Sequence, residues 1–458
     1  MGNLYFHFLY ISKYISFDYF ICNEKVGKMK NYEIYNNYKI AFETPDDGYS
    51  YFFGYYDKSP LNKDNTKLLA HRVSFDGRDV QDGDIAEIGY FDVSLKEFVK
   101  LDETLAWNWQ QGAQLQWLPP KYDEVVIYNS VVNDKFISII YNIKTDHKRV
   151  IPFPIYVVHP NGKEALGVNY ERHYWCRPGY NYQNIKNKKW DIPNHEEDGI
   201  YKINLETGEV NLLVKIKDIV NNQKLPEFDT CNNWLEHIMF NPSGDRFMFF
   251  HRWHEGGVDY TRLYTANSND GNGLYFYPDN RFYSHAYWRN DKELTIWTME
   301  PKGNYNEQKE RSIIQFIKSI IFLRTILRQI YRYVLKPLLP QKTIDKISPP
   351  SRLINFIDET VRYEVIGGGD LSCNGHNSWS KDENTILNDS YDDEKGYRHL
   401  ELFDVKSKNL TRIGRFYSTY NSCGYRADLH PRFSFDEKYI IIDSAHKEKK
   451  KILLLRNI

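Results

Sequence analysis

Short apolar stretches and polar turns alternate along most of the chain, and four segments share one layout. Each begins His-x-x-aromatic, continues through a polar turn with Asp, Asn or Gly, and ends in an alternating apolar stretch. The four segments are HIMFNPSGDRFMFFHRW from residue 237, HAYWRNDKELTIW from 285, HNSWSKDENTILNDSY from 376 and HPRFSFDEKYIIIDSAH from 430. Apolar residues at a period of two on either side of a turn predict β-hairpins.

Further copies of this hairpin occur earlier in the chain. QLQWLPPKYDEVVIYNS has Gln114 where the others have His, and two degenerate copies surround Tyr55 and Ile155. More strand–turn–strand segments lie between the copies, which gives seven units of about four strands, roughly 45–55 residues apart once one insertion is removed. This period predicts an all-β fold, a seven-bladed β-propeller over residues 29–458. A pair of β-sandwiches is the alternative, but it would not repeat one turn at one phase.

The two ends of the propeller sequence complement each other. The last unit stops at KILLLRNI (451–458), and YEIYNNYKIAFE (32–43) has the composition of a strand. We predict that this early strand completes the last blade and closes the ring, which removes exposed sheet edges. Residues 1–28 are expected to be an N-terminal extension, since their apolar run is interrupted by Lys13 and Asp18 and makes a poor signal peptide.

An insertion at 306–350 interrupts the fifth unit with a helical pattern. Between residues 313 and 336, cations recur every four residues opposite an apolar face; they are Arg324, Arg328, Arg332 and Lys336. This α-helical insertion has the pattern of an interfacial membrane helix. A helix packed against the propeller or at a dimer contact explains the same pattern, and both interpretations are open.

Composition narrows the class of protein. An apolar fraction of 41% and a formal net charge of −1 indicate a globular protein without the basic signature of nucleic-acid binding. The five cysteines are scattered and form no CxxC pair, which favours a reducing compartment. A cytoplasmic location is therefore expected, with peripheral contact at the inner face of the membrane through 313–336 as an open alternative.

The repeat phase gathers polar side chains on one face of the propeller. In a blade, the inner strand starts on the face to which the second strand returns, so the hairpin starts and ends meet there. We expect His237, His285, His376 and His430 to point toward the axis from successive blades, with Gln114 from an earlier one. Around them we expect Arg72, Arg172, His251, Arg252, Trp253, Asp389, Tyr391, Arg426 and Asp428. Histidines and arginines in phase indicate a functional site, because desolvated polar groups need partners.

Part of this pattern resembles a known family. His-Pro-x-Phe-Ser-x-Asp at 430–436, HNSWS at 376–380 and FNPSGDRFMFFHRWH at 240–254 resemble the oligogalacturonate lyases, and more loosely the propeller ulvan lyases. The resemblance covers most of units four to seven and fades before about residue 230. It implies a cytoplasmic seven-bladed propeller that cleaves uronate-containing oligosaccharides or polysaccharides by β-elimination.

The resemblance also implies a divalent metal held by histidines of adjacent blades and a glutamine. His376 and His430 match the family's histidines, Asp428 replaces another histidine, and Tyr425 stands in the place of the glutamine. The implied metal site is therefore His376, Asp428 and His430. Carboxylate and imidazole ligands suit Mn or Zn better than Ca.

β-Elimination assigns roles to the remaining residues. The proton at C5 of a uronate becomes acidic when metal or arginine neutralises the adjacent carboxylate, so Arg252 and Arg426 are expected to bind it. His285 or His237 would remove the proton. Tyr391 or Tyr287 would protonate the leaving oxygen. The substrate-binding candidates are Gln114, Arg72, Arg172, His251, Trp253 and Asp389.

Two other functions are compatible with the sequence. Propellers are common binding platforms, so a non-catalytic carbohydrate-binding or glycan-assembly protein at a membrane surface is one alternative. A glycosidase on the same scaffold is another, with Asp389, Asp428 and Glu236 as its candidate carboxylates. The partner expected in each case is an oligosaccharide or polysaccharide, acidic for the lyase.

Overall fold

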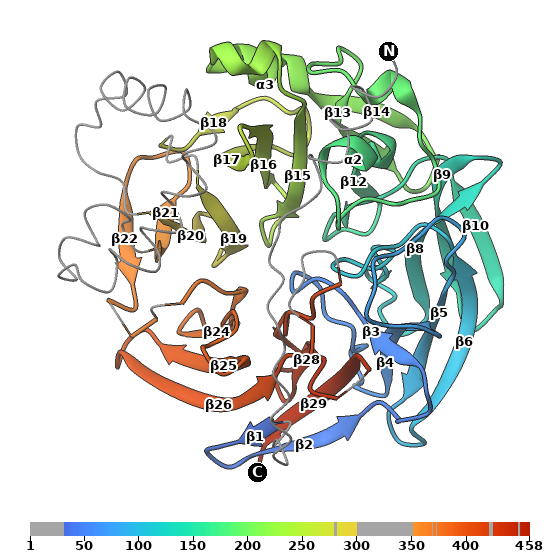
Figure 1. Cartoon of the computed structure of the whole chain (residues 1–458), viewed down its shortest axis with the longest axis vertical. Coiled ribbons are helices and arrows are strands. Elements are labelled where there is room, and N and C mark those ends of the chain that lie inside the picture. The colour runs from blue at the N-terminus through green and yellow to red at the C-terminus, as the bar shows by residue number, and fades with distance from the viewer. Residues whose placement is uncertain are drawn as a thin grey trace, which may run out of the picture. The chain divides into compact units, whose positions relative to one another are not determined.

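The β-strands form seven sheets arranged around a common axis (Figure 1). This computed structural model describes residues 32–278, 282–299, 351–368, 370–371, 373–420, 425–447 and 449–458. The chain divides into two units, Met1–Asn31 and Tyr32–Ile458, and the first lies outside the described residues. The predicted seven-bladed β-propeller is confirmed, and the alternative of two sandwiches is wrong.

The first three blades each contain four antiparallel strands. Blade 1 comprises β3 (Ser50–Phe52), β4 (Lys67–Val73), β5 (Ala86–Asp92) and β6 (Glu97–Thr104). Blade 2 comprises β7 (Gln116–Trp117), β8 (Val125–Val132), β9 (Lys135–Asn142) and β10 (His147–Ile151). Blade 3 comprises β11 (Val157–Val158), β12 (Glu164–Val168), β13 (Gly199–Asn204) and β14 (Val210–Lys215).

The remaining four blades continue in chain order. Blade 4 comprises β15 (Asn233–Phe240), β16 (Arg246–Glu255), β17 (Val258–Asn267) and β18 (Tyr275–Phe276). Blade 5 comprises β19 (Tyr283–Trp288), β20 (Glu293–Met299), β21 (Ser351–Ile357) and β22 (Tyr363–Ile366). Blade 6 comprises β23 (Asn377–Trp379), β24 (Thr385–Asp389), β25 (Tyr397–Asp404), β26 (Asn409–Tyr417) and, at its edge, β1 (Tyr32–Ile34). Blade 7 comprises β27 (Arg432–Phe433), β28 (Ile440–Ser444), β29 (Lys451–Asn457) and β2 (Tyr38–Glu43).

The ring is closed by strands from both ends of this unit. Strand β2 pairs antiparallel with β29, from Tyr38 opposite Asn457 to Glu43 opposite Leu453. Strand β1 pairs with β26 of the preceding blade. The predicted closure by an early strand is therefore confirmed, and in Figure 1 the blue and red strands lie side by side at the lower edge.

Helical segments occur beside blades 3 and 4. They are α2 (Tyr170–Cys176), η1 (Lys188–Trp190), α3 (Ile216–Asn222) and η2 (Pro226–Asp229). Helix α2 begins at Asn169, whose side chain accepts a hydrogen bond from the N–H of Glu171. In the described part of the chain, no helix combines the length and apolarity needed to span a membrane. The helix predicted within 306–350, and its membrane contact at 313–336, lie outside the described residues and stay predictions.

Apolar layers between neighbouring blades form the core. One layer joins Phe42, Phe52, Leu69 and Ile441 from blades 7 and 1, and another joins Leu387, Leu400 and Ile442 from blades 6 and 7. The short central strands are buried on both faces, as in the run Ile440–Ser444. These layers hold the inner strand of each blade in place, so residues at equivalent positions of the inner strands face the same channel.

The polar turn of the repeat has its own hydrogen bonds. The Ser434 hydroxyl donates to Asp436 at 2.8 Å and accepts from the N–H of Tyr439 at 3.1 Å. Ser380 makes the same pair of bonds with Asp382 and with the N–H of Thr385. These turns return the chain from the inner strand to the second strand, which is why the polar spacing recurs in the sequence.

Candidate functional site

The repeated histidines sit at an interruption of the inner strands. His237, His285 and His430 have positive φ angles of 54°, 45° and 45°, and Gln114 has 55°. The pairing register of the inner strand shifts at Glu236/Met239 and at Ser284/Ala286, so two of these positions are β-bulges. A bulge turns a side chain out of the regular alternation. These residues therefore recur at one position of the repeat because the backbone there has a positive φ angle, in two blades within a β-bulge.

Three of the histidines meet at one place. The ring centroids of His285 and His376 are 4.0 Å apart, and those of His376 and His430 are 4.3 Å apart. His237 lies on the other side of Tyr55, whose ring centroid is 5.2 Å from both His237 and His430. The convergence expected from the repeat phase is confirmed. Tyr55 is the side chain that joins the two sides.

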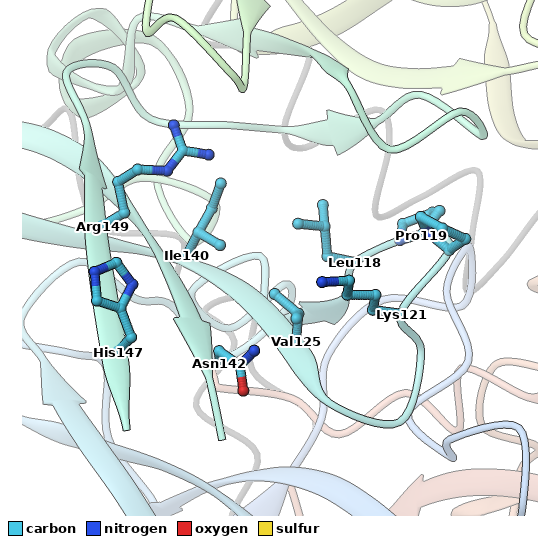
Figure 2. A pocket seen from close by; sticks show the side chains of 9 residues that line it. Leu118, Pro119, Lys121, Val125, Ile140, Asn142, His147 and Arg149 are labelled. Carbon is cyan, nitrogen blue, oxygen red and sulfur yellow. The ribbon is translucent and has the colours of Figure 1, made fainter. Parts of the chain in front are cut away.

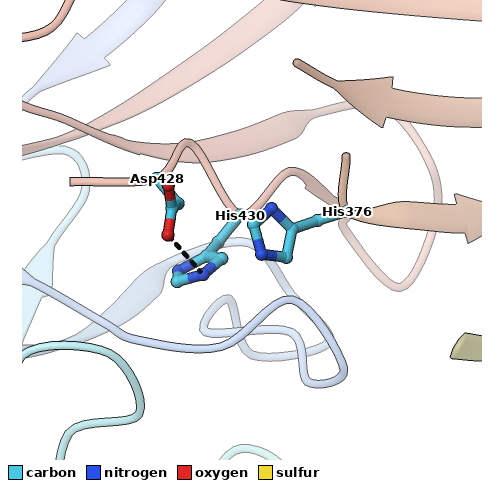
Figure 3. A group of neighbouring side chains, drawn as sticks. All are labelled: His376, Asp428 and His430. Carbon is cyan, nitrogen blue, oxygen red and sulfur yellow. Dashed lines mark ion pairs between the residues drawn. The ribbon is translucent and has the colours of Figure 1, made fainter. Parts of the chain in front are cut away.

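His376, Asp428 and His430 are placed as a metal site requires (Figure 3). One potential ligand atom from each residue lies within 4.8 Å of the others, and all three side chains are buried. Among the described residues, Nε2 of His376 and Nε2 of His430 have no hydrogen-bond partner. Buried polar atoms without partners are costly, and a divalent cation would satisfy both nitrogens. The donor set therefore fits a divalent metal.

Asp389 orients this group from behind. His376 Nδ1 lies 3.0 Å from both carboxylate oxygens of Asp389, and the N–H of His430 donates to Asp389 Oδ2 at 3.2 Å. A carboxylate that accepts from Nδ1–H leaves Nε2 as the ligand atom, as in many metal-binding histidines. Asp389 thus reaches the predicted site as a partner of His376 and not as a group that faces substrate.

Two arginines hold Asp428 in its ionised form. Arg398 Nη1 lies 2.8 Å from Asp428 Oδ1, and Arg426 Nε lies 2.6 Å from Oδ2. Burial acts to raise the pKa of Asp428, but Arg426 and Arg398 outweigh it and keep the pKa well below the usual value. Arg398 also pairs with Asp392 at 2.5 Å, which compensates part of its charge. The carboxylate is thus available as a ligand at neutral pH.

A second buried ionic group lies beside His237. Glu236 Oε1 is 2.6 Å from Arg252 Nε, 3.2 Å from Arg177 Nε and 3.3 Å from His237 Nδ1. Burial opposes ionisation of Glu236, yet Arg177 and Arg252 hold its pKa well below the usual value. Burial lowers the pKa of His237 to about 4, so this imidazole is neutral at neutral pH. Arg177 also lies 3.5 Å from Asp259 Oδ2, whereas Glu236 is the carboxylate that the structure places beside Arg252.

His285 is held between two polar partners. Its Nδ1 lies 3.0 Å from Asn374 Oδ1, and its Nε2 lies 3.4 Å from the hydroxyl of Tyr391. Because the Asn374 oxygen can only accept, Nδ1 carries the proton and Nε2 is the acceptor. Burial lowers the pKa of His285 well below the usual value, which keeps the ring neutral. This tautomer is the one that can take a proton at Nε2.

Several predicted site residues are not brought to this group. Arg172 is buried and donates to the backbone carbonyls of Asn233, Trp190 and Pro193. His251 and Trp253 are fully buried on the face of β16 opposite to Arg252, since side chains alternate along a strand. For these three residues the prediction of a substrate-binding position is wrong.

Three more candidates have other surroundings. Arg72 pairs with Glu87, and its guanidinium lies over the rings of Tyr49 and Phe98 in blade 1. The substrate-binding role of Arg72 stays a prediction. Gln114 is buried and donates to Gln111 Oε1 and to the hydroxyl of Tyr170, both at 3.1 Å. Tyr287 lines a separate cavity of about 240 Å³ together with Lys381 and Glu437.

The structure adds residues that sequence reasoning missed. Tyr55 and Tyr56 lie against the histidines, with the Tyr56 ring centroid 5.1 Å from His376. Arg177, Tyr180 and Asn374 come from loops between strands. Of these residues, only Tyr55 and Tyr56 could have been found from the sequence, because they occupy the degenerate first copy of the repeat.

The open space around the site is unevenly distributed. The void beside Tyr55, Tyr56 and His237 is only about 10 Å³, close to the volume that one water needs. A larger cavity of about 270 Å³ lies in blade 2 between Leu118–Lys121 and strands β9 and β10 (Figure 2). Its lining comes from the β7–β8 turn and from residues of β8, β9 and β10. The volume of a cavity alone therefore does not identify the functional site.

Comparisons with known proteins support the fold. No protein-family model matches the chain, and no curated protein matches its sequence. One similar solved structure is an oligogalacturonate lyase from Vibrio parahaemolyticus, with a TM-score of 0.59 and 14% identity over 93% of this chain and 96% of that one. Another is an oligogalacturonate lyase in complex with manganese, with a TM-score of 0.59 and 16% identity over the same shares of both chains. The resemblance found in the repeat motifs is thus confirmed at the level of the fold.

Proposed function

We propose that the protein is a lyase that cleaves a uronate-containing oligosaccharide or polysaccharide by β-elimination. The observation that carries the proposal is the pair of Nε2 atoms of His376 and His430, which have no hydrogen-bond partner among the described residues and lie beside ionised Asp428. They lie next to a neutral histidine and three arginines, which are the groups that this chemistry needs. The similarity to a lyase bound to manganese agrees with this proposal.

We propose Mn or Zn as the metal, held by His376, Asp428 and His430. When bound, a divalent cation would neutralise the uronate carboxylate and so make the C5 proton more acidic. Arg252 and Arg426 are assigned to the same carboxylate or to its neighbour, because both face the group with side chains that are mostly buried. Arg252 uses its Nε–H for Glu236 and Arg426 uses its Nε–H for Asp428, so each guanidinium has further N–H donors for a substrate.

His285 is assigned the role of base and Tyr391 that of acid. In the reaction, Nε2 of His285 takes the C5 proton, the C4–O bond breaks, and a double bond forms between C4 and C5. The phenol of Tyr391 gives its proton to the leaving oxygen, so atoms and charges balance. Asn374 holds the histidine in the required tautomer through Nδ1. His237 is the second candidate base, and Tyr287 is a poor acid because it lies in the separate cavity.

A decisive experiment measures the ultraviolet absorbance of the unsaturated uronate product on a panel of acidic glycans, with EDTA, Mn²⁺ or Zn²⁺ added. Activity on at least one glycan, lost with EDTA and restored by metal, is expected. His376→Ala and His430→Ala should each weaken metal binding by at least about 100-fold, more than loss of an outer partner costs. His254→Ala is the matched control, since this histidine lies exposed on β16 and pairs only with Asp259 in the described structure.

One observation favours a second function, a non-catalytic glycan-binding propeller. The four histidines are almost fully buried and the adjoining void is small, so a metal there could serve only to tie blades 6 and 7 together. In that case the glycan and the metal would both bind, but no unsaturated product would form with any glycan. A stable protein whose unfolding midpoint falls on metal removal, without turnover, would replace the lyase assignment.

The proposed location is the cytoplasm. It is supported by Cys176 and Cys373, which are free thiols in the described structure.

A further inference from the structure

A separate cavity of about 170 Å³ lies on the face of the propeller that carries the histidines. Its walls are the β4–β5 loop with Asp79, the segment before β7 with Asn108 and Trp109, and the loop after α2 with Asn181 and Gln183. All three segments precede an inner strand or follow a second strand, so the blade topology puts them on that face. Typical small-molecule sites measure roughly 300–1,000 Å³, so this one has room for a single unit of a longer ligand.

The loop that forms one wall of the cavity also touches the proposed site. Gly179 and Asn181 line the cavity, while Tyr180 between them faces the other way. The Tyr180 hydroxyl accepts from Arg426 Nη2 at 3.4 Å, and its ring centroid is 5.6 Å from that of His237. A single loop residue, Tyr180, thus lies between the cavity and the site with Arg426 and His237.

A second link runs through the opposite wall of the cavity. Gln110, next to Trp109, donates through Nε2 to the carbonyl of Arg426 at 3.0 Å. A chain molecule with one unit at the histidines can therefore place its neighbouring unit in the cavity.

Asn108 presents a buried donor to this cavity. Its Oδ1 accepts from the N–H groups of Gln110 and Gln111, at 3.1 and 2.9 Å. Its Nδ2 has no hydrogen-bond partner among the described residues, although the side chain is only 3% exposed. A buried amide donor without a partner is costly, so a ligand oxygen at this point would be stabilising.

The charge of the lining differs from that of the proposed site. Arginines 177, 252 and 426 surround the histidine group, but the cavity lining has no Lys or Arg and includes one carboxylate, Asp79. Two cations close by have partners within the protein. Arg78 binds Asp84 at 2.6 and 2.9 Å. Lys450 Nζ donates to the carbonyl of Arg426 at 3.2 Å and lies 4.1 Å from the ring centroid of Trp109. A carboxylate in the cavity would meet repulsion from Asp79, whereas a hydroxyl could donate to it.

We propose that this cavity is a subsite for a neutral sugar unit next to the uronate at the histidines. The inference rests on the proposed function, and it narrows the substrate to a glycan in which uronate units neighbour neutral sugars, as opposed to a homopolymer of uronate. Asn108 Nδ2 donates to a ring or hydroxyl oxygen of the neutral unit, and Asp79 accepts from its hydroxyls. Trp109 supplies an apolar edge for the sugar ring.

The test compares two substrate sets on wild type and variants: homo-oligouronates, and oligosaccharides that alternate uronate with a neutral sugar. Asn108→Asp keeps the oxygen that binds Gln110 and Gln111 but replaces the unpartnered donor, so it should lower kcat/KM on the mixed set by about 10–100-fold. On the homo-oligouronates the same variant adds a second carboxylate to the cavity that contains Asp79, so it should not raise kcat/KM on that set. Asp79→Asn should raise kcat/KM on homo-oligouronates, because it removes the repulsion. His147→Ala, in the blade 2 cavity, is the control.

Calorimetric binding of the mixed oligosaccharide under EDTA separates the two proposals. If wild type binds it and Asn108→Asp weakens that binding by about 10-fold or more, the subsite stands even where no glycan yields unsaturated product and the lyase assignment falls. If homo-oligouronates are cleaved at least as well as the mixed set and Asp79→Asn does not raise their kcat/KM, the subsite is overturned while the lyase assignment stands. Absence of mixed-oligosaccharide binding to wild type also overturns the subsite.

Discussion

Two arcs of the same channel use the same backbone position in opposite ways. The histidine arc comprises His237, His285, His376 and His430 of blades 4–7, and the amide arc comprises Gln111, Gln114, Tyr156 and Tyr170. Gln114 and His237 have nearly equal φ angles of 55° and 54°. In the amide arc, Gln111 donates to the Tyr156 hydroxyl at 2.7 Å, and Gln114 donates to Gln111 and Tyr170.

The histidine arc leaves two ring nitrogens without a hydrogen bond. Nε2 of His376 and of His430 have no hydrogen-bond partner among the described residues, and Asp428 Oδ2 lies 3.9 Å from Nε2 of His430 (Figure 3). The amide arc contributes to stability because its bonds are made within the protein. The histidine arc forgoes that stability, as functional sites often do, and leaves these nitrogens available to the proposed metal. Three substitutions test this division between the arcs, and a fourth tests a histidine outside both.

The largest effect is expected from His285→Ala in the histidine arc. Loss of the proposed base should lower turnover by about 10²–10⁴-fold, the usual contribution of general acid–base catalysis. Metal binding should persist, because His285 is not among the three candidate ligands. Turnover and metal titration by calorimetry measure both. Simultaneous loss of metal binding would show that His285 belongs to the metal site.

Glu236→Gln, at the start of the histidine arc, should destabilise the protein by about 3–5 kcal/mol. The change removes the charge that compensates Arg177 and Arg252, which are mostly buried. Urea denaturation gives the free energy of unfolding, and Glu97→Gln on the exposed β6 serves as control. An unchanged midpoint would mean that solvent already screens these arginines.

His71 is a histidine outside both arcs, and it predicts a pH effect on stability of about 3 kcal/mol. Its Nε2 accepts from the N–H of Ala113 at 3.0 Å, Nδ1 lies 3.3 Å from the carbonyl of Phe52, and burial lowers its pKa to about 4. The folded-state pKa lies below the unfolded value of 6.5, so the neutral ring stabilises the fold above pH 6.5. That contribution is lost as the pH falls from 6.5 toward 4.

Denaturant unfolding between these pH values measures the His71 effect. In His71→Gln, the slope of stability against pH over this range should become shallower. An equal slope in wild type and variant would assign the acid sensitivity to other groups.

The smallest effect is expected from Gln114→Ala in the amide arc. The substitution leaves Gln111 Oε1 and the Tyr170 hydroxyl without their donor, which should cost about 1–3 kcal/mol. Metal affinity should stay the same, since Gln114 touches none of the candidate ligands in the described hydrogen bonds. Thermal unfolding and metal titration give the two readouts. A drop in metal affinity would contradict the division into two arcs.

The repeat phase predicted much of this site because it follows the backbone. The repeat phase placed His376 and His430 on one face, the family resemblance grouped them with Asp428, and the potential ligand atoms of the three residues do meet. The same logic failed for His251 and Trp253, because neighbours along a strand point to opposite faces and only Arg252 reaches the site. The alternation of β16 would have excluded both residues.

Residues on loops could not be placed in this way. Asn374 binds His285 across 89 residues of sequence, and Tyr180 meets Arg426 across 246. No period relates these pairs, so their contacts depend on how the loops fold over the face. Tyr55 lies between these two cases: it belongs to a copy of the repeat, but it is a tyrosine and not one of the repeated histidines.

By itself the sequence determined the seven blades, the closing strand and the in-phase histidines, because each depends on local alternation and on turns that recur at one period. Only the tertiary structure decided which polar groups are left unpaired. Which ring nitrogen of a histidine carries the proton depends on the side chain that contacts Nδ1. Asp389 contacts Nδ1 of His376 and Asn374 contacts Nδ1 of His285, and both contacts depend on how strands and loops pair. The same holds for the charge around Glu236 and Asp428, where arginines from distant segments set the ionisation of each carboxylate. Local pattern specifies the backbone, and long-range packing specifies the electrostatics.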